Sequence, residues 1–296
     1  MAEPARVEGP WVRFWHEFAE SRLALVGLAL LALVVAIAIL APVISPQNPY
    51  DLAQLDVMDS KLAPGEASGT GKTYWLGTDD QGRDMLSGIY YGLRISLGVG
   101  IASTIFALAI GLVFGLVAAY FGGWVDTLVM RIVDIQLSFP AILIALVLLA
   151  VLGQGVDKIV VALVTVQWAY YARTVRSSAL VERQKEYIEA ARVLALGQAR
   201  VVFRHLLPNC LPPLIVVATV QVAHAIALEA TLSFLGLGLP ITEPSLGLLI
   251  SNGFQYLLSG KYWISFYPGI ALLVTIMAIN LVADQLRDVL NPRLRK

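Results

Sequence analysis

The segment ISLGVGIASTIFALAIGLVFGLVAAYF, Ile95–Phe121, runs for 27 residues without one charged side chain. A helix needs about 20 mainly apolar residues to cross the hydrocarbon core of a bilayer. Two more segments are long and uncharged, Leu23–Ile44 over 22 residues and Trp263–Ala283 over 21. These three stretches predict an all-α integral membrane protein.

Three further candidates bring the predicted count to about six transmembrane helices. Ile135–Gly155 is uncharged over 21 residues, with Pro140 marking a point where a helix begins or bends, and Leu211–Leu239 is apolar except for Glu229. Ile159–Ala172 covers only 14 residues, but its helix can extend if the flanking charged side chains reach back to the membrane surface. The composition agrees, since 14% of the residues are charged, against roughly 25% in soluble domains. The first apolar run is longer than the 7–15 residues of a signal peptide, so an uncleaved anchor is expected.

Basic residues are distributed unequally between the two sides that six spans define. The side that holds both termini carries fifteen of them and the other side carries six. Because the positive-inside bias places the basic side in the cytoplasm, both termini are predicted to be cytoplasmic. The predicted regions are a cytoplasmic segment 1–22, a first transmembrane helix 23–44, an extracytoplasmic loop 45–94, a five-helix core 95–288 with a cytoplasmic loop 173–209, and a cytoplasmic tail 289–296.

Several functions are disfavoured by the sequence. The 21 basic and 21 acidic residues cancel, which leaves no electrostatic footprint for nucleic acid. A single cysteine, Cys210, and three scattered histidines predict neither a disulfide nor a metal site. Gly69–Thr73 (GTGKT) resembles the end of a phosphate-binding loop, but Glu66 stands where that loop requires glycine. We therefore expect this chain to bind no nucleotide or other cofactor itself.

The cytoplasmic loop carries the most informative pattern. Val181–Leu194 is rich in helix formers, and two alanines in it leave a stretch of backbone bare enough for another protein to approach. Glu189 and Arg192, three residues apart, are predicted to pair on that helix. Gly197 is predicted to make the turn out of it, and Val201–Leu207 to begin a second helix that leads into the fifth span. The alternative is an ordinary solvated surface helix.

Two parts of this loop resemble the EAA loop of ABC-importer permeases, Glu186–Arg192 (EYIEAAR) and Arg204–Asn209 (RHLLPN). Further segments resemble the permeases for dipeptides, oligopeptides and nickel: Leu76–Asp84 (LGTDDQGRD) with Tyr91–Leu97 (YGLRISL), Glu229–Gly238 (EATLSFLGLG), and Leu286–Arg293 (LRDVLNPR). The resemblance implies a C-type permease of type I (MetI-like) architecture in a bacterial or archaeal cell (inner) membrane.

Partners and cargo follow from the same resemblance. It implies a second, homologous permease chain, two cytoplasmic ATPase subunits that bind ATP and Mg, an extracytoplasmic substrate-binding protein, and surrounding lipid. It assigns this chain transport without an ATPase site of its own. Peptides are the expected cargo, with nickel, glutathione and other small solutes left open.

The resemblance also implies site residues. Those expected to couple to the ATPase are Glu189, Ala190, Ala191, Arg192, Gly197, Leu207 and Pro208. The family's loop glycine usually falls where this chain has Ala195. Further site residues are expected in the segment Leu76–Asp84 of the predicted extracytoplasmic loop, called the outer segment below. They have either a structural role or a role in contacting the binding protein, and they are Gly77, Thr78, Asp79, Asp80, Gly82, Arg83 and Asp84.

Glu229 is the one acid inside a predicted span, and burying it in lipid would be costly. Three interpretations stay open: a structural acid with satisfied hydrogen bonds, a residue lining the pathway, or a proton relay. An ion-coupled transporter using Glu229, His224 and Asp284 would be expected to show internal repeats, which we do not find. An intramembrane hydrolase would need a paired nucleophile and base within the spans, and no such spacing occurs. Gly111 and Gly115 predict close approach of another helix, from either this chain or a partner.

Overall fold

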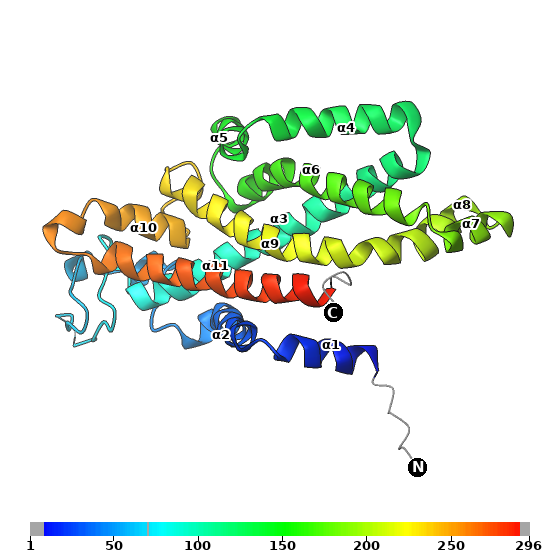
Figure 1. Ribbon diagram of the computed structural model, residues 1–296. Helices are drawn as coiled ribbons and strands as arrows, with labels where there is room; N and C mark the ends of the chain where they lie inside the picture. The colour runs from blue at the N-terminus through cyan, green and yellow to red at the C-terminus, as the bar shows by residue number, and fades with distance from the viewer. Residues whose placement is uncertain (1–8, 70, 291–296) are drawn as a thin grey trace, which may run out of the picture.

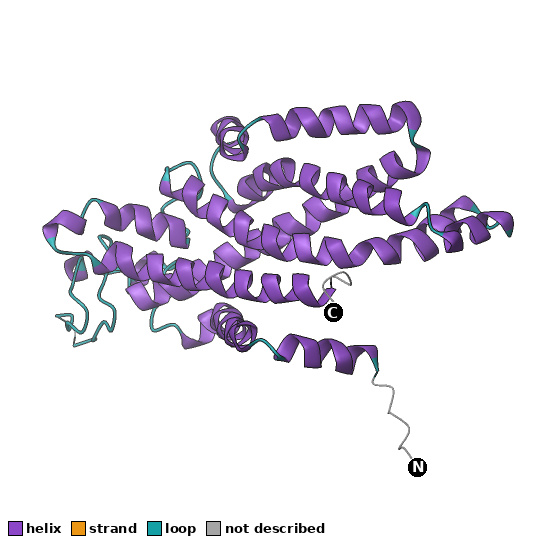
Figure 2. Cartoon of the chain, in the orientation of Figure 1, coloured by secondary structure: helices purple, strands orange, loops and turns teal. Residues whose placement is uncertain are grey.

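The computed structural model describes residues 9–69 and 71–290, without the side chains of Pro10, Leu52 and Arg192. Within those residues the chain is helical and contains no strand, as Figure 2 shows. The helices are α1 (Pro10–Ala19), α2 (Arg22–Ile44), α3 (Met85–Phe121), α4 (Gly123–Ser138), α5 (Ala141–Leu152), α6 (Val156–Glu182), α7 (Glu186–Val193), α8 (Gln198–Arg200), α9 (Leu207–Phe234), α10 (Leu246–Phe254) and α11 (Trp263–Leu290). The shorter pieces are 3₁₀ turns at Leu52–Gln54, Val57–Asp59 and Leu257–Ser259, and a π-helix at Val201–Leu206.

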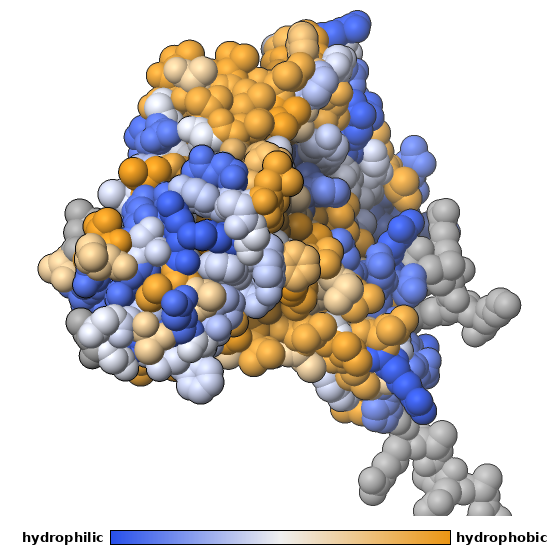
Figure 3. Space-filling view, turned by 90° about the vertical axis from the view of Figure 1, so that its left-hand side faces the viewer, coloured by the Kyte–Doolittle hydropathy of each residue, from blue (hydrophilic) through white to orange (hydrophobic). Residues whose placement is uncertain are grey.

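The bundle is elongated, with α3, α6, α9 and α11 running roughly along its long axis (Figure 1). The short helices α7 and α8 lie at one end, while α10 and the segment between α2 and α3 lie at the other. The predicted cytoplasmic and extracytoplasmic loops are therefore at opposite ends of the molecule. Seen from the end that carries α10, hydrophilic residues gather over the loop segment and apolar residues lie above and below it (Figure 3).

Four helical stretches are long and apolar enough to cross a membrane: α2, Gln198–Phe234, α3 and α11. The α4–α5 pair meets the same criterion only as a broken span, which makes five. The remaining predicted span, Ile159–Ala172, lies within α6. This helix is long enough to cross a membrane but is not apolar enough to meet the criterion. Its neighbours explain this composition: α6 packs against α3, α4, α5 and α9, so many of its residues face protein rather than lipid.

The predicted span over Ile135–Gly155 is broken next to Pro140, where the sequence predicted that a helix begins or bends. α4 ends at Ser138, the next residues take extended conformations, and α5 leaves at 89° to α4. Pro140 explains the break, because its ring is incompatible with the helical turn before it and biases Phe139 away from helical angles. The apolar run is thus divided between the last turn of α4 and the whole of α5.

Gly111 and Gly115 do allow close approach, and the helix that approaches is α6 of the same chain. A Cβ at Gly111 would lie 2.6 Å from the Trp168 carbonyl oxygen, and one at Gly115 would lie 2.6 Å from that of Ala172. Both distances are shorter than a van der Waals contact, so only glycine fits. The α3–α6 pair is therefore packed backbone against backbone, which maximises its dispersion contacts.

Candidate functional site

The loop predicted to be cytoplasmic starts with a break between α6 and α7, not with the single helix predicted over Val181–Leu194. α6 continues to Glu182, three non-helical residues follow, and α7 begins at Glu186. Glu182 ties the two helices together: Lys185 Nζ lies 2.7 Å from one carboxylate oxygen, and the Tyr187 hydroxyl donates to the other at 2.5 Å. The start of α7 is thus fixed to the end of α6.

The two faces of α7 differ sharply. Ile188 and Ala191 are buried, with exposed fractions of 1% and 4%, whereas Glu189 and Ala190 are exposed. The buried pair belongs to an apolar cluster that also includes Leu116 of α3 and residues of α6 and α9. α7 is therefore held by the helical core on one side and presents a carboxylate and a small side chain on the other. The side chain of Arg192, and with it the predicted pair with Glu189, lies outside the described residues.

The sequence predicts that Gly197 makes the turn after α7, but in the structure Ala195 makes it. Ala195 has φ +55°, in the left-handed region, whereas Gly197 has φ −58°. The Leu196 N–H donates to the Ala191 carbonyl at 3.2 Å, which is the six-to-one bond of a Schellman motif with Ala195 at the left-handed position. Leu196 then packs against the apolar cluster that holds α7.

The second predicted helix of the loop is present as the π-helix Val201–Leu206, which runs directly into α9. Val201 and Leu206 are buried in the same cluster as Ile188, and Leu207 packs against it. Pro208 is exposed in the first turn of α9, and because the π-helix continues into α9, its missing N–H removes one backbone hydrogen bond at this junction. Both ends of the loop are consequently anchored in one core.

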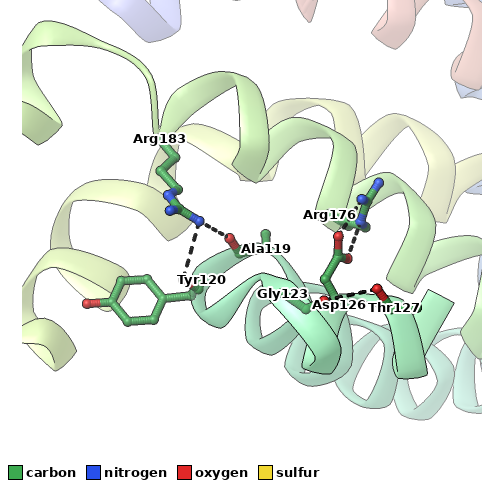
Figure 4. A network of polar contacts seen from close by, with 7 residues as sticks. All are labelled: Ala119, Tyr120, Gly123, Asp126, Thr127, Arg176 and Arg183. Atoms are coloured by element: carbon green, nitrogen blue, oxygen red, sulfur yellow. Dashed lines mark hydrogen bonds and ion pairs between the residues drawn. The ribbon is translucent and has the colours of Figure 1, made fainter.

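Two arginines, Arg176 of α6 and Arg183 in the link that follows α6, connect this loop region to α4 and α3, as Figure 4 shows. Arg183 donates to the carbonyl oxygens of Ala119 and Tyr120 at 2.7 and 3.3 Å, which caps the C-terminal end of α3. Arg176 binds Asp126 of α4 through two hydrogen bonds of 2.5 and 2.6 Å. These contacts could not be predicted from the sequence, because the partners lie 50 to 64 residues apart and no local pattern marks them.

The outer segment is folded into the protein and exposes little of itself. Thr78, Asp79, Arg83 and Asp84 are between 0% and 2% exposed, and Gly77 and Gly82 are also buried. Asp80 alone of the seven predicted residues is partly exposed. These positions favour the structural role among the two that the sequence left open.

Each buried residue of this segment makes identifiable contacts. Asp79 accepts hydrogen bonds from the backbone N–H groups of Gln81 and Arg83 at 2.8 and 2.9 Å, a usual arrangement for an aspartate in a turn. Burial raises the pKa of Asp79 to about 6, against the lowering effect of these bonds and of the Arg83 charge. The Arg83 guanidinium donates to the Ile241 carbonyl at 2.7 Å, which joins this segment to the α9–α10 connection.

The two glycines and Asp84 complete the segment. Gly77 and Gly82 have φ of +77° and +76°, and a Cβ on Gly82 would lie 2.1 Å from the Asp56 carbonyl oxygen. Asp84 caps α3 by accepting from the Ser87 backbone N–H at 2.9 Å. The segment therefore needs these residue types in order to fold.

Glu229 is fully buried between α9 and α3. Its carboxylate accepts from Ser233 of the same helix at 2.8 Å and from Ser96 of α3 at 2.9 Å. Both oxygens are thus hydrogen-bonded within the chain, which is what the structural interpretation requires. The other two residues of the ion-coupled hypothesis lie apart from it: His224 contacts Gln221 at 3.0 Å, and Asp284 is exposed on α11.

No group of three or more metal-ligating side chains occurs among the described residues. A bundle of helices long and apolar enough to cross a membrane, with the charged surface helix α7 anchored at one end of it, fits the class of transmembrane permeases.

The chain belongs to the family described as the binding-protein-dependent transport system inner membrane component, whose model matches residues 111–296. A second model, the N-terminal transmembrane domain of oligopeptide transport permease C, matches residues 9–64. The resemblance noted in the sequence is thereby confirmed, and the ion-coupled and hydrolase alternatives are set aside.

Named relatives cover nearly the whole chain. The dipeptide transport system permease protein DppC of Escherichia coli is 41% identical over 97% of this chain and 94% of its own length. DppC of Haemophilus influenzae is 36% identical over 97% and 96%, and the glutathione permease GsiD of Pectobacterium atrosepticum is 34% identical over 98% and 93%. Among solved structures, the MetNI methionine ABC transporter in an inward-facing conformation shares the fold, with a TM-score of 0.57 at 23% identity over 70% of this chain and 98% of that one.

The chain is therefore a multi-pass permease subunit of an ABC importer. A permease of this kind works with ATPase subunits and with a substrate-binding protein. The binding protein is named in the family's description.

Proposed function

We propose that this chain carries di- and oligopeptides across the cell membrane, as one of two homologous permeases in the importer. The relatives named for dipeptides support a peptide cargo, and glutathione, the cargo in another relative's name, is itself a small peptide. The orientation expected from the basic residues puts both termini, α7 and α8 in the cytoplasm. ATP and Mg are bound by the partner ATPases, and a binding protein delivers the peptide at the opposite end.

One observation carries the coupling role of the loop: α7 is anchored on one face and free on the other. Glu189 and Ala190 are exposed, while Ile188 and Ala191 are held in the core shared by α3, α6 and α9. A movement imposed on the exposed face is consequently transmitted to the helices, because the buried face cannot slide independently of them. Alternating access is the mechanism this arrangement serves.

The transmission has a covalent and a polar part. Only three residues separate α6 from α7, so α7 has little freedom to move without α6. Arg183 lies in that link and binds the end of α3, so the same displacement reaches α3 directly. Leu207 and Pro208 connect the other end of the loop to α9.

Charge reversal at the exposed carboxylate tests this coupling. The experiment uses the assembled importer in proteoliposomes and measures peptide uptake together with the ATPase activity stimulated by loaded binding protein. Glu189→Lys should abolish uptake, because it reverses the charge on the proposed docking face, and the complex should still insert in the membrane. Asp288→Lys, an exposed reversal on α11, is the matched control and should leave uptake unchanged.

Normal uptake and normal ATPase stimulation in the Glu189→Lys complex would contradict the coupling role. Uptake lost equally in both variants would point to a general effect of added positive charge.

A further inference from the structure

A cavity of about 480 Å³ lies between α5, α6 and α9, within the range of roughly 300–1,000 Å³ usual for small-molecule sites. Its walls combine apolar residues with polar ones. The polar lining residues are Gln167, Tyr170, Gln221, His224 and Thr231. None of its lining residues is an acid, a lysine or an arginine.

These polar groups lie at the depth of the membrane and not at its surface. At 1.5 Å per residue, Gln221 and His224 are about 21 and 25 Å along α9 from its start at Leu207. Gln167 is about 16 Å along α6 from Val156, in a hydrocarbon core that is about 30 Å thick. Tyr170 is 44% exposed and His224 is also exposed, so neither polar group is covered by this chain.

Facing hydrocarbon, the second ring nitrogen of His224, Nε2, and the Tyr170 hydroxyl would be left without hydrogen-bond partners, which is unfavourable. This part of the surface is therefore suited to water or to a polar ligand, in contrast to the apolar faces of α2 and α5. The groups are also ordered: Gln167 Nε2 donates to the Gln221 carbonyl at 3.2 Å, and Gln221 Oε1 lies 3.0 Å from His224 Nδ1. The side chains on α6 and α9 thus form one connected set.

We propose that this cavity forms part of the translocation pathway and recognises the uncharged amide groups of a passing peptide. The proposal rests on the peptide transport proposed above. Side-chain amides, an imidazole and a phenol together donate and accept hydrogen bonds, which matches the N–H and C=O groups of a peptide bond. The lack of a formal charge suits many sequences equally, and a single histidine does not suit a metal ion.

Cross-linking identifies the occupant directly. A photoreactive benzoylphenylalanine replaces Tyr170 in the complete importer, and radiolabelled alanyl-alanine is supplied on the binding protein. Light should attach label to this chain during ATP turnover, and excess unlabelled peptide should prevent it. Attachment only to the second permease chain or to lipid would overturn the proposal, because those neighbours would then occupy the cavity.

Uptake measurements give the functional counterpart. The double variant Tyr170→Phe with His224→Leu should lower the rate of alanyl-alanine uptake roughly five- to tenfold, as expected for the loss of one or two hydrogen bonds. ATPase stimulation and the thermal stability of the complex should stay near wild type, so that less peptide moves per ATP. Thr219→Val, a polar-to-apolar change on α9 outside the cavity lining, is the control and should not change uptake.

The outcomes distinguish a failure of this inference from a failure of the proposed peptide transport. If the wild-type importer moves alanyl-alanine and the double variant moves it equally well, this inference fails and peptide transport stands. If the wild-type importer moves neither alanyl-alanine nor trialanine, the proposed function itself fails.

Discussion

Two substitutions of the left-handed alanine in the turn after α7 are expected to change the stability of that turn in opposite directions. Ala195 adopts φ +55°, a conformation that costs a residue with a Cβ roughly 1–2 kcal/mol. Glycine avoids this cost but loses more backbone entropy on ordering, by roughly 0.5–1 kcal/mol. Ala195→Gly should therefore stabilise the turn by about 0.5–1 kcal/mol, and Ala195→Val should loosen it.

Amide hydrogen exchange in the assembled importer measures this turn directly. The reporters are the N–H groups of Leu194 and Leu196, which donate to the carbonyls of Ala190 and Ala191 at 3.0 and 3.2 Å. A change of about 1 kcal/mol corresponds to roughly a fivefold change in exchange rate. Exchange should slow by up to that factor with glycine at position 195 and accelerate with valine.

Gly197→Ala is the matched control, because Gly197 has φ −58° and a Cβ there would meet no atom within 4 Å. It should leave the exchange rates within about twofold of wild type. Faster exchange in Ala195→Gly, or a loosening by Gly197→Ala larger than that by Ala195→Val, would refute the assignment of the turn.

Three further predictions concern contacts outside this turn. Glu229→Leu leaves the hydroxyls of Ser96 and Ser233 without an acceptor, so it should destabilise the purified permease by about 2–5 kcal/mol in thermal unfolding. Glu229→Gln keeps an acceptor oxygen and should cost less than about 1.5 kcal/mol while preserving uptake; an inactive but stable glutamine variant would contradict the structural role. Reversing Asp126 or Arg176 singly should cost about 1.5–3 kcal/mol, and the double swap should recover at least half of that; no recovery would mean that the two charges do not pair. Because burial raises the pKa of Asp79 to about 6, the folded protein keeps a proton that the unfolded chain loses near pH 4, so stability should fall by up to about 3 kcal/mol between pH 4 and 6. Asp79→Asn should remove this pH dependence, and melting curves with the same pH slope as wild type would count against it.

Much of the helical framework was predictable from the sequence. The first, second and last spans are marked by long uncharged runs, and their helices match or extend those runs, as α2 does from Arg22 to Ile44. The burial of Glu229 followed from the cost of an acid in lipid. These features depend on composition alone, which is why one sequence was enough to find them.

Features that depend on local backbone angles or on distant partners were not predictable in the same way. Pro140 signalled a break, but the 89° direction of α5 is set by what α5 packs against. Gly197 was chosen for the turn because glycine adopts left-handed angles easily, whereas the chain places Ala195 there and its Schellman bond holds it. The burial of Arg83 was missed, since charged residues in a loop are usually solvated and its acceptor, the Ile241 carbonyl, is 158 residues away.

The contact at Gly111 and Gly115 has a practical consequence for following the transport cycle. Where two backbones touch, no layer of side chains remains that could shear, so α3 and α6 keep a constant spacing while other helices rearrange. Spin labels at the exposed positions Val113 and Val161 would thus report a distance that stays fixed through ATP turnover. That pair would serve as an internal ruler, against which displacements of α5 or α11 in the same sample become quantitative.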